Sequence, residues 1–222
     1  MKKVFLFFLI AILNVFAVDT PKIQVADIFN PHTATPSLMI EDTLKKPKDF
    51  NPTNELTRYV GSFYVATGEL LYLKGRITDA FGIPIINAKV YIWQTNSAGK
   101  YHSVLKTTSL QYDENFIMSG TSKTDNLGIY GFKTVFPGFE EKERAPHINI
   151  IVQHDNFDTL ITEIYFEDHY MNKSDPIYQS YTENDKKMLT ARVTNVNKRN
   201  TADGKIATFD IVLDGIHGYK KY

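Results

Sequence analysis

The residues best suited to chemistry gather in one stretch, from Arg144 to His154. Successive side chains of a β-strand point to opposite faces, so His147 and Asn149 would share one face of a strand. The opposite face would carry Ile148, Ile150 and Val152, which suits a buried core. An imidazole and an amide at the entrance of a strand, beside a guanidinium group, can form a small polar site. A lone histidine there is more often a hydrogen-bonded structural residue, so other segments must decide.

Two acidic residues could join this site. Glu163 lies in the β-rich segment Thr159–Phe166, where it would share a face with Tyr165. A carboxylate on that face needs a partner, and Arg144 is a candidate. A structural Arg144–Glu163 pair and a catalytic role are equally open. Glu140 begins a run of charged residues, which is typical of a solvated loop.

Short β-rich segments separated by turn residues must position these side chains. With 222 residues, the chain is one domain or one domain with an arm. We expect strands over Leu70–Ile77, Lys89–Thr95, Ile129–Phe136, Arg144–His154, Thr159–Phe166, Thr190–Asn197 and Ala207–Asp214. We expect a loop over Asp168–Pro176, a polar helix near Thr182–Leu189 and a turn over Ala202–Lys205. Many short strands with almost no helix predict an all-β protein, a β-sandwich.

The N-terminus has the layout of a secretory signal. Two lysines precede an apolar run over Val4–Leu13, which is too short to span a bilayer comfortably, and small residues lead to Ala17. We expect cleavage after Ala17 and a periplasmic or secreted protein without a membrane-spanning segment; an uncleaved anchor is the alternative. Residues 18–57, which contain several prolines, are expected to form an extended arm or a disordered linker, and residues 58–222 the sandwich domain.

Composition limits the partners. Lys and Arg together number 25, as do Asp and Glu, so no basic surplus points to nucleic acid. The sequence has no cysteine, which excludes disulfides, zinc thiolates, a thiol nucleophile and a lipid anchor on cysteine. Nothing in the sequence fixes the oligomeric state, and an oligomer stays open.

A series of short blocks spans most of the chain: Gly75–Asp79, Gly82–Pro84, Ala88–Gln94, Gly99–Tyr101, Asn115–Phe116, Thr124–Asp125, Gly128–Phe132, Pro137–Gly138, Arg144–His147, Tyr165–Phe166 and Phe209–Leu213. This series resembles the intradiol ring-cleavage dioxygenases, the group that contains protocatechuate and catechol dioxygenases. The blocks occur in one order between Glu69 and Gly215, and that order is more specific than any single block. The resemblance implies a β-sandwich with a metal pocket at one end, which agrees with the strand pattern.

The resemblance also implies a metal site. Members of the family hold a ferric ion, Fe(III), with two tyrosines and two histidines, and use O2 to open a small aromatic diol between its two hydroxylated carbons. Tyr101 and His147 match one ligand of each kind, and phenolate and imidazole suit iron(III). Arg144 matches an arginine that stabilises negative charge on the bound substrate.

The chain departs from the family pattern at three positions. Asn149 stands in place of the second histidine, and its carbonyl oxygen is a weak ligand. Phe139 and Glu140 follow Pro137–Gly138, where the second tyrosine is expected. Glu163 stands where the family has a glutamine. Glu140 or Glu163 could supply the missing ligand.

Two functions therefore follow from the sequence. One is an exported, altered intradiol dioxygenase with Tyr101, His147 and a carboxylate at iron. The other is an exported β-sandwich that has lost ring cleavage and serves as a small-ligand binding or structural module. Iron content and oxygen uptake distinguish the two.

Overall fold

The computed structural model describes residues 31–38, 45–101, 113–140, 144–197 and 200–215. The expected signal segment, residues 1–17, lies outside them, as do residues 18–30 of the expected arm. The strands are β1 (Leu70–Thr78), β2 (Lys89–Trp93), β3 (Ser119–Lys123), β4 (Ile129–Val135), β5 (Ile148–His154), β6 (Phe157–Phe166), β7 (Thr190–Asn197), β8 (Asn200–Thr208) and β9 (Ile211–Val212). Three short helical segments follow β6, namely η2 (Tyr170–Lys173), α2 (Pro176–Ser180) and α3 (Glu183–Met188).

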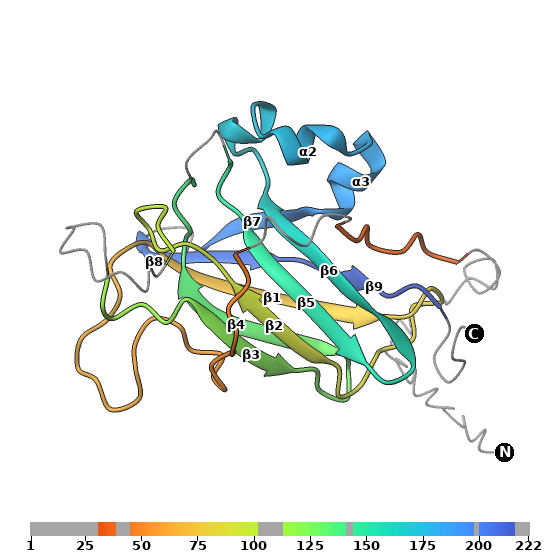
Figure 1. Ribbon diagram of the computed structural model, residues 1–222, viewed down its shortest axis with the longest axis horizontal. Helices are drawn as coiled ribbons and strands as arrows, with labels where there is room; N and C mark the ends of the chain where they lie inside the picture. The colour runs from red at the N-terminus through yellow and green to blue at the C-terminus, as the bar shows by residue number, and fades with distance from the viewer. Residues whose placement is uncertain (1–30, 39–44, 102–112, 141–143, 198–199, 216–222) are drawn as a thin grey trace, which may run out of the picture.

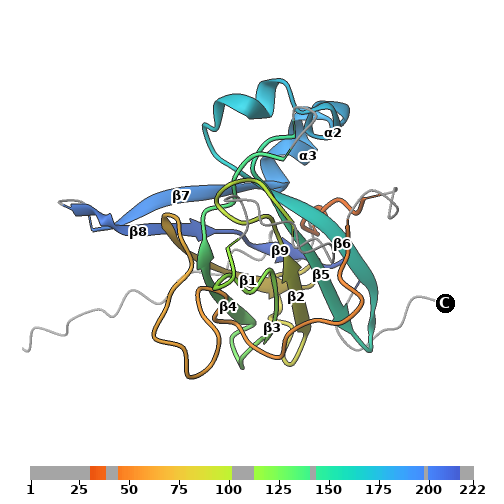
Figure 2. The same ribbon diagram turned by 60° about the vertical axis from the view of Figure 1, so that its left-hand side comes forward.

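The strands form one path that folds over on itself. Neighbours along the path are β3, β2, β5, β6, β7, β8, β1 and β4, and β9 pairs with β1. The two ends of the path, β3 and β4, contact each other. Figure 1 shows β2, β5 and β6 in a layer in front of β1, β8 and β9, and Figure 2 shows the same arrangement from the side. The fold is the β-sandwich that the strand pattern predicts.

Most expected strands match the observed ones closely, and α3 lies where a polar helix is expected. Three expectations are wrong. The expected loop over Asp168–Pro176 contains η2, and the expected strand over Ala207–Asp214 is divided between the end of β8 and the two-residue β9. The sequence pattern also misses β3, because Ser119–Lys123 consists of small and polar residues. The expected turn over Ala202–Lys205 belongs to β8, where Gly204 has a φ of +96° and an added Cβ would lie 2.6 Å from the carbonyl oxygen of Leu70.

Strand β5 has the two faces that alternation predicts. Ile148, Ile150 and Val152 are fully buried in the main core cluster. Ile151, on the opposite face, packs with Trp93 in a second cluster. The strand is therefore covered on both faces, and its polar side chains must find partners inside the protein.

The described parts of the expected arm run along strand edges. The backbone N–H of Leu38 donates to the carbonyl of Ile161 in β6 over 2.7 Å. The backbone N–H of Thr121 in β3 donates to the carbonyl of Thr53 over 2.8 Å. Leu56, at the end of this segment, is fully buried in the main core. These backbone bonds satisfy edge groups of the sheet that would otherwise stay unpaired.

The helical segments form a cap above the end of β6 (Figure 1). Asp175 is the N-cap of α2, because its side chain accepts hydrogen bonds from the N–H groups of Ile177 and Tyr178, and Pro176 begins the helix. Tyr165 of β6 is fully buried beneath this cap. No helix within the described ranges is long and apolar enough to cross a membrane.

Tyr130 links the free energy of unfolding to pH in the alkaline range. Its side chain is 2% exposed, and its hydroxyl donates to the carbonyl of Phe209 over 2.8 Å. Burial, and then the nearby Asp210, raise the pKa of this phenol well above its usual range. A phenol with a raised pKa keeps its proton longer in the folded state than in the unfolded chain. The free energy of unfolding should therefore hold below about pH 10 and fall above it.

Urea unfolding at increasing pH measures this fall. In Tyr130→Phe the decline above about pH 10 should be shallower, because one group that links folding to protons is gone. Tyr170→Phe, which changes a side chain that is 74% exposed, should decline like the wild type. An equal decline in Tyr130→Phe and the wild type would contradict the assignment.

Candidate functional site

Arg144 and Glu163 meet at one end of the sandwich, where β5 begins and β6 ends. Arg144 Nη2 donates to Glu163 Oε2 over 2.6 Å, and the hydroxyl of Tyr165 donates to the same oxygen over 2.5 Å. Glu163 is 1% exposed and pairs in register with Asn149 of β5. The Arg144–Glu163 pair, which the sequence leaves open beside a catalytic role for Glu163, is therefore present on the face that also carries Tyr165.

Asp175 holds another nitrogen of the same guanidinium group. Arg144 Nε donates to Asp175 Oδ2 over 3.0 Å, and this oxygen also accepts the backbone N–H of Ala145 over 2.8 Å. Burial opposes the charge on Arg144, but Glu163, Tyr165 and Asp175 outweigh it and raise the pKa of the guanidinium. Arg144 is therefore a fixed cation, with its orientation set from two elements.

His147 faces the second oxygen of Glu163. Its Nδ1 lies 2.7 Å from the carbonyl oxygen of Ala145, and because a carbonyl only accepts, Nδ1 carries a proton. In neutral imidazole the lone pair is then on Nε2, which lies 3.7 Å from Glu163 Oε1. Within the described part of the chain, Oε1 is buried and has no hydrogen-bond partner. When the imidazole is neutral, two acceptor atoms thus face each other across a gap too long for a hydrogen bond, and when it is protonated the two groups form an ion pair.

Asn149 connects Tyr101 to this cluster. Its Nδ2 donates to the Tyr101 hydroxyl over 3.1 Å and to the backbone carbonyl of Trp93 over 3.2 Å. Its Oδ1 is buried and has no hydrogen-bond partner among the described residues. Burial, and then Glu140, raise the pKa of Tyr101 above its usual range, so the phenol keeps its proton with these residues alone. The residues that meet here are Tyr101, His147, Asn149 and Glu163.

The donor atoms of this cluster fit a cation. Phenol oxygen, imidazole nitrogen, carboxylate oxygen and amide oxygen are all metal ligands. Two atoms that each bind one ion at about 2.1 Å lie roughly 3–4 Å apart, which matches the 3.7 Å between His147 Nε2 and Glu163 Oε1. A backbone carbonyl on the other nitrogen is common for a ligand histidine. The described residues contain no metal-competent group of three His, Cys, Asp or Glu side chains, so a metal here also needs Tyr101 or Asn149.

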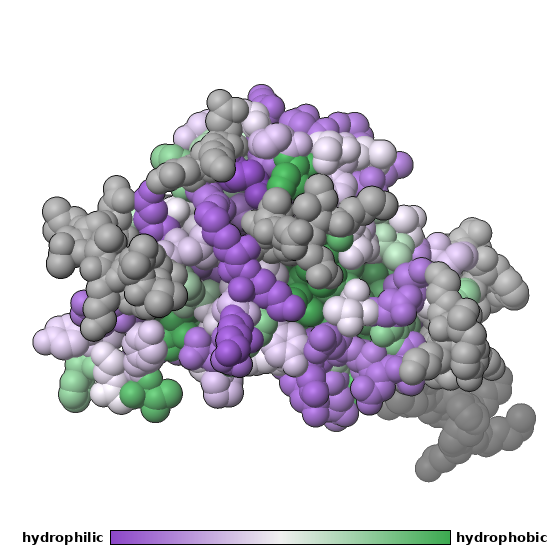
Figure 3. Space-filling model, in the orientation of Figure 1, coloured by the Kyte–Doolittle hydropathy of each residue, from purple (hydrophilic) through white to green (hydrophobic). Residues whose placement is uncertain are grey.

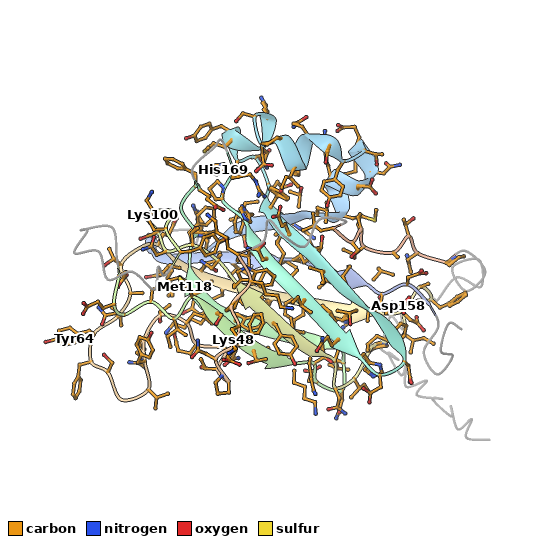
Figure 4. The ribbon with its side chains drawn as sticks, in the orientation of Figure 1. Lys48, Tyr64, Lys100, Met118, Asp158 and His169 are labelled. Atoms are coloured by element: carbon orange, nitrogen blue, oxygen red, sulfur yellow. The ribbon has the colours of Figure 1, made fainter. Side chains whose placement is uncertain are left out.

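Glu140 lies on the other side of Tyr101. It forms an ion pair with Lys45, whose ammonium nitrogen lies 5.1 Å from the centroid of the Tyr101 ring. All three residues line a cavity of about 800 Å³, as do the aromatic residues Trp93 and Phe116. Figure 4 labels Lys100 and Met118, which also line it. The structure therefore brings Glu140 beside Tyr101, but pairs it with a lysine of the expected arm.

A glycine turn sets Tyr101 against the Phe139 segment. Gly99 has a φ of +75°, and a Cβ there would lie 1.9 Å from the carbonyl oxygen of Phe139. Gly99→Ala should lower the free energy of unfolding by more than about 1 kcal/mol in a urea titration. Gly61→Ala is the control for the backbone cost alone, since its φ is +81° and no atom lies within 4 Å of an added Cβ. Equal losses in the two variants would contradict the close packing.

The sequence pattern alone does not single out Asp175 or Lys45. The pair Asp175–Pro176 is an N-cap signal, which places a carboxylate at the start of a helix but not beside Arg144. Lys45 lies in the expected arm, and no local pattern brings it to Tyr101. Both contacts depend on tertiary packing between segments far apart in the chain.

Comparisons with known proteins show which family the chain belongs to. A sequence profile described as Dioxygenase matches residues 53–215. The protocatechuate 3,4-dioxygenase beta chain of Burkholderia cepacia is 33% identical over 156 residues, which are 67% of this chain and 66% of that one. The chain belongs to the intradiol ring-cleavage dioxygenases. A Rickettsia typhi protein named as a dioxygenase is 33% identical over 186 residues, 79% of this chain and 85% of that protein, and the match to one from Rickettsia bellii spans 60% of that protein.

Solved structures share the fold of this family member. The dioxygenase domain of a carbohydrate-binding fusion protein from Streptomyces sp. SirexAA-E matches with a TM-score of 0.63 at 22% identity, over 82% of this chain and 99% of that chain. The 3-chlorocatechol 1,2-dioxygenase of Rhodococcus opacus 1CP matches with a TM-score of 0.61 at 15% identity, over 86% of this chain and 76% of that chain. Intradiol dioxygenases are iron-dependent, so the function of this member depends on whether its altered cluster holds iron.

Proposed function

We propose that this protein is an exported intradiol dioxygenase that opens catechol-type aromatic diols with O2 at a non-haem iron. The observation that supports iron binding most is the buried Glu163 Oε1, which has no hydrogen-bond partner among the described residues and lies 3.7 Å from His147 Nε2. A cation between the two atoms would give Oε1 a partner and bind the imidazole nitrogen. Export rests on the charged, apolar and small-residue pattern that ends at Ala17.

Four side chains would hold the iron, and they are Tyr101, His147, Glu163 and Asn149. Iron(III) held there would supply Lewis-acid and redox chemistry for the reaction of an aromatic diol with O2. The raised pKa of Tyr101 means that its phenol ionises on ligation rather than before it. Iron binding should therefore release a proton and strengthen as the pH rises.

Arg144 would stabilise the negative charge that a diol acquires on binding. Its Nη2 and Nε are held by Glu163 and Asp175, so the guanidinium group cannot turn away. Its side chain is only 12% exposed, where charge is weakly screened. Glu163 Oε2 is held by Arg144 and by the Tyr165 hydroxyl, so Oε1 is the oxygen left to bind iron, and Glu163 would act as a ligand.

Oxygen uptake tests this proposal. The purified protein, loaded with iron(III) under mild conditions, should consume O2 with catechol or protocatechuate. Tyr101→Phe should abolish the uptake, because it removes the phenol oxygen from the cluster. Tyr91→Phe, the same exchange on strand β2, should retain it. Iron-loaded wild type that consumes no O2 with either diol would contradict the proposal.

A small-ligand binding module is the second candidate. Two observations favour it: Glu163 is already neutralised by Arg144, and Asn149 provides only an amide where the family has a histidine. Such a protein would bind an aromatic ligand in the cavity of about 800 Å³ without iron. Equilibrium dialysis of catechol against the iron-free protein separates the candidates. Stoichiometric binding, with no O2 uptake after iron loading, favours the module.

A further inference from the structure

The loop over residues 57–66 has an apolar tip. The backbone N–H of Ala66 donates to the carbonyl of Thr57 over 2.7 Å, which closes the loop at its base. Figure 3 shows green side chains projecting at the lower left, where Figure 1 draws this loop in orange and Figure 4 labels Tyr64. Such a tip is unfavourable in water. The exposed fractions are 99% for Val60, 99% for Phe63, 76% for Tyr64 and 58% for Val65.

The base of the loop presents this tip in a defined conformation. Leu56 is fully buried and Ala66 is 9% exposed, so both ends of the loop are anchored in the main core. The N–H of Ser62 donates to the carbonyl of Tyr59 over 3.0 Å, and Gly61 takes the positive φ of +81° that this turn requires. The apolar side chains are therefore displayed outward by the fold.

Lysines lie beside the same loop. Tyr59 lines the cavity of about 800 Å³ together with four lysines and two carboxylates. One of the carboxylates, Glu140, is paired with Lys45. The described lining is thus net positive, and it adjoins the apolar tip through Tyr59. The lysines are Lys45, Lys46, Lys48 and Lys100, and the carboxylates are Asp49 and Glu140.

We propose that the loop over residues 57–66 docks the protein on the surface of an anionic lipid bilayer. An apolar tip on a loop that adjoins a lysine-rich cavity through Tyr59 matches both components of such a surface, the acyl boundary and the negative headgroups. The inference goes beyond ring cleavage and does not depend on it. Because Tyr59 belongs to both the loop and the cavity lining, docking would bring the cavity to the lipid surface.

A second copy of this chain is the competing occupant of the tip. A stable protein interface buries about 800 Å² on each partner, whereas a buried aromatic side chain contributes only about 150–250 Å². Two aromatic and two valine side chains on a projecting loop fall short of that area. A bilayer requires no complementary shape, so it accepts a projecting tip that a flat protein surface would not.

Vesicle co-sedimentation of the exported protein tests the proposal. Wild type should sediment with vesicles of phosphatidylcholine and phosphatidylglycerol more than with phosphatidylcholine alone, and added salt should weaken the binding. Phe63→Ser/Tyr64→Ser should lower the partition by at least about tenfold, because two exposed aromatic side chains are lost. Leu127→Ser, which removes a leucine that is 57% exposed in the turn between β3 and β4, should bind like the wild type.

Two results would overturn the proposal. One is equal sedimentation of Phe63→Ser/Tyr64→Ser and the wild type, with urea unfolding showing that both are folded. The other is a dimer in sedimentation velocity that the same double variant dissociates, because a second copy would then cover the tip. Neither measurement involves iron or O2, so a failure of ring cleavage leaves this test intact.

Discussion

Replacing Arg144 with leucine will lower the free energy of unfolding by about 3–5 kcal/mol. The guanidinium group is the positive partner of two buried carboxylates, since Glu163 is 1% and Asp175 is 0% exposed. Without Arg144, both carboxylates stay out of water and lose the charge that offsets their desolvation. Leucine replaces much of the apolar stem of arginine, so the lost packing is small. The lost positive charge therefore accounts for most of the change in the free energy of unfolding.

Urea unfolding, followed by the fluorescence of the single tryptophan Trp93, measures this loss. Glu69→Gln is the control, because it breaks a half-exposed ion pair with Lys205 and should cost less than about 1 kcal/mol. Glu163→Gln should also destabilise the protein, since Arg144 would lose one of its two carboxylates. If Arg144→Leu costs no more than Glu69→Gln, the buried charge cluster is not a determinant of stability.

Exchanges at Asn149 and His147 will change iron affinity in opposite directions. Asn149→His replaces an amide oxygen with an imidazole nitrogen, a better ligand for iron, and should raise the affinity by at least about tenfold. His147→Ala removes Nε2, which faces Glu163 Oε1 at 3.7 Å, and should lower it by on the order of 100-fold. Both expectations follow from the place of the two side chains, His147 just before β5 and Asn149 within it, beside Glu163.

Competition dialysis against a chelator measures these affinities. His154→Ala is the matched control, because His154 lies at the other end of β5 and its Nδ1 accepts the N–H of Asn156 over 3.2 Å. This variant should bind iron like the wild type. Iron affinity that is the same in His147→Ala and His154→Ala would show that His147 is not a ligand.

Local patterns predict a good part of this fold and site. Period-two alternation predicts that His147 and Asn149 share one side of the β5 segment and that the core residues lie on the other, and β5 begins directly after His147. The same alternation places Glu163 on the face of β6 that carries Tyr165, and the 2.6 Å bond to Arg144 gives this carboxylate the partner that the sequence names as a candidate. These predictions succeed because a strand fixes side-chain direction residue by residue, independent of distant segments.

Contacts between distant segments limit what the sequence can predict. Asp175 reaches Arg144 from the helical cap, and Lys45 reaches Glu140 from the expected arm. Gly204 resembles a turn residue in the sequence, yet it lies inside β8. A glycine is needed at this position because the Leu70 backbone leaves no room for a side chain. In each case the deciding contact joins residues that are far apart in the chain, which no local pattern encodes.

The visible absorption spectrum tests the central claim, that Tyr101 binds iron in this sandwich, most directly. Phenolate bound to iron(III) absorbs visible light by charge transfer to the metal. We expect the ferric-loaded wild type to be coloured, with stoichiometric iron by elemental analysis, and Tyr101→Phe to lose the colour. A colourless wild type that retains no iron after mild ferric loading would contradict the account.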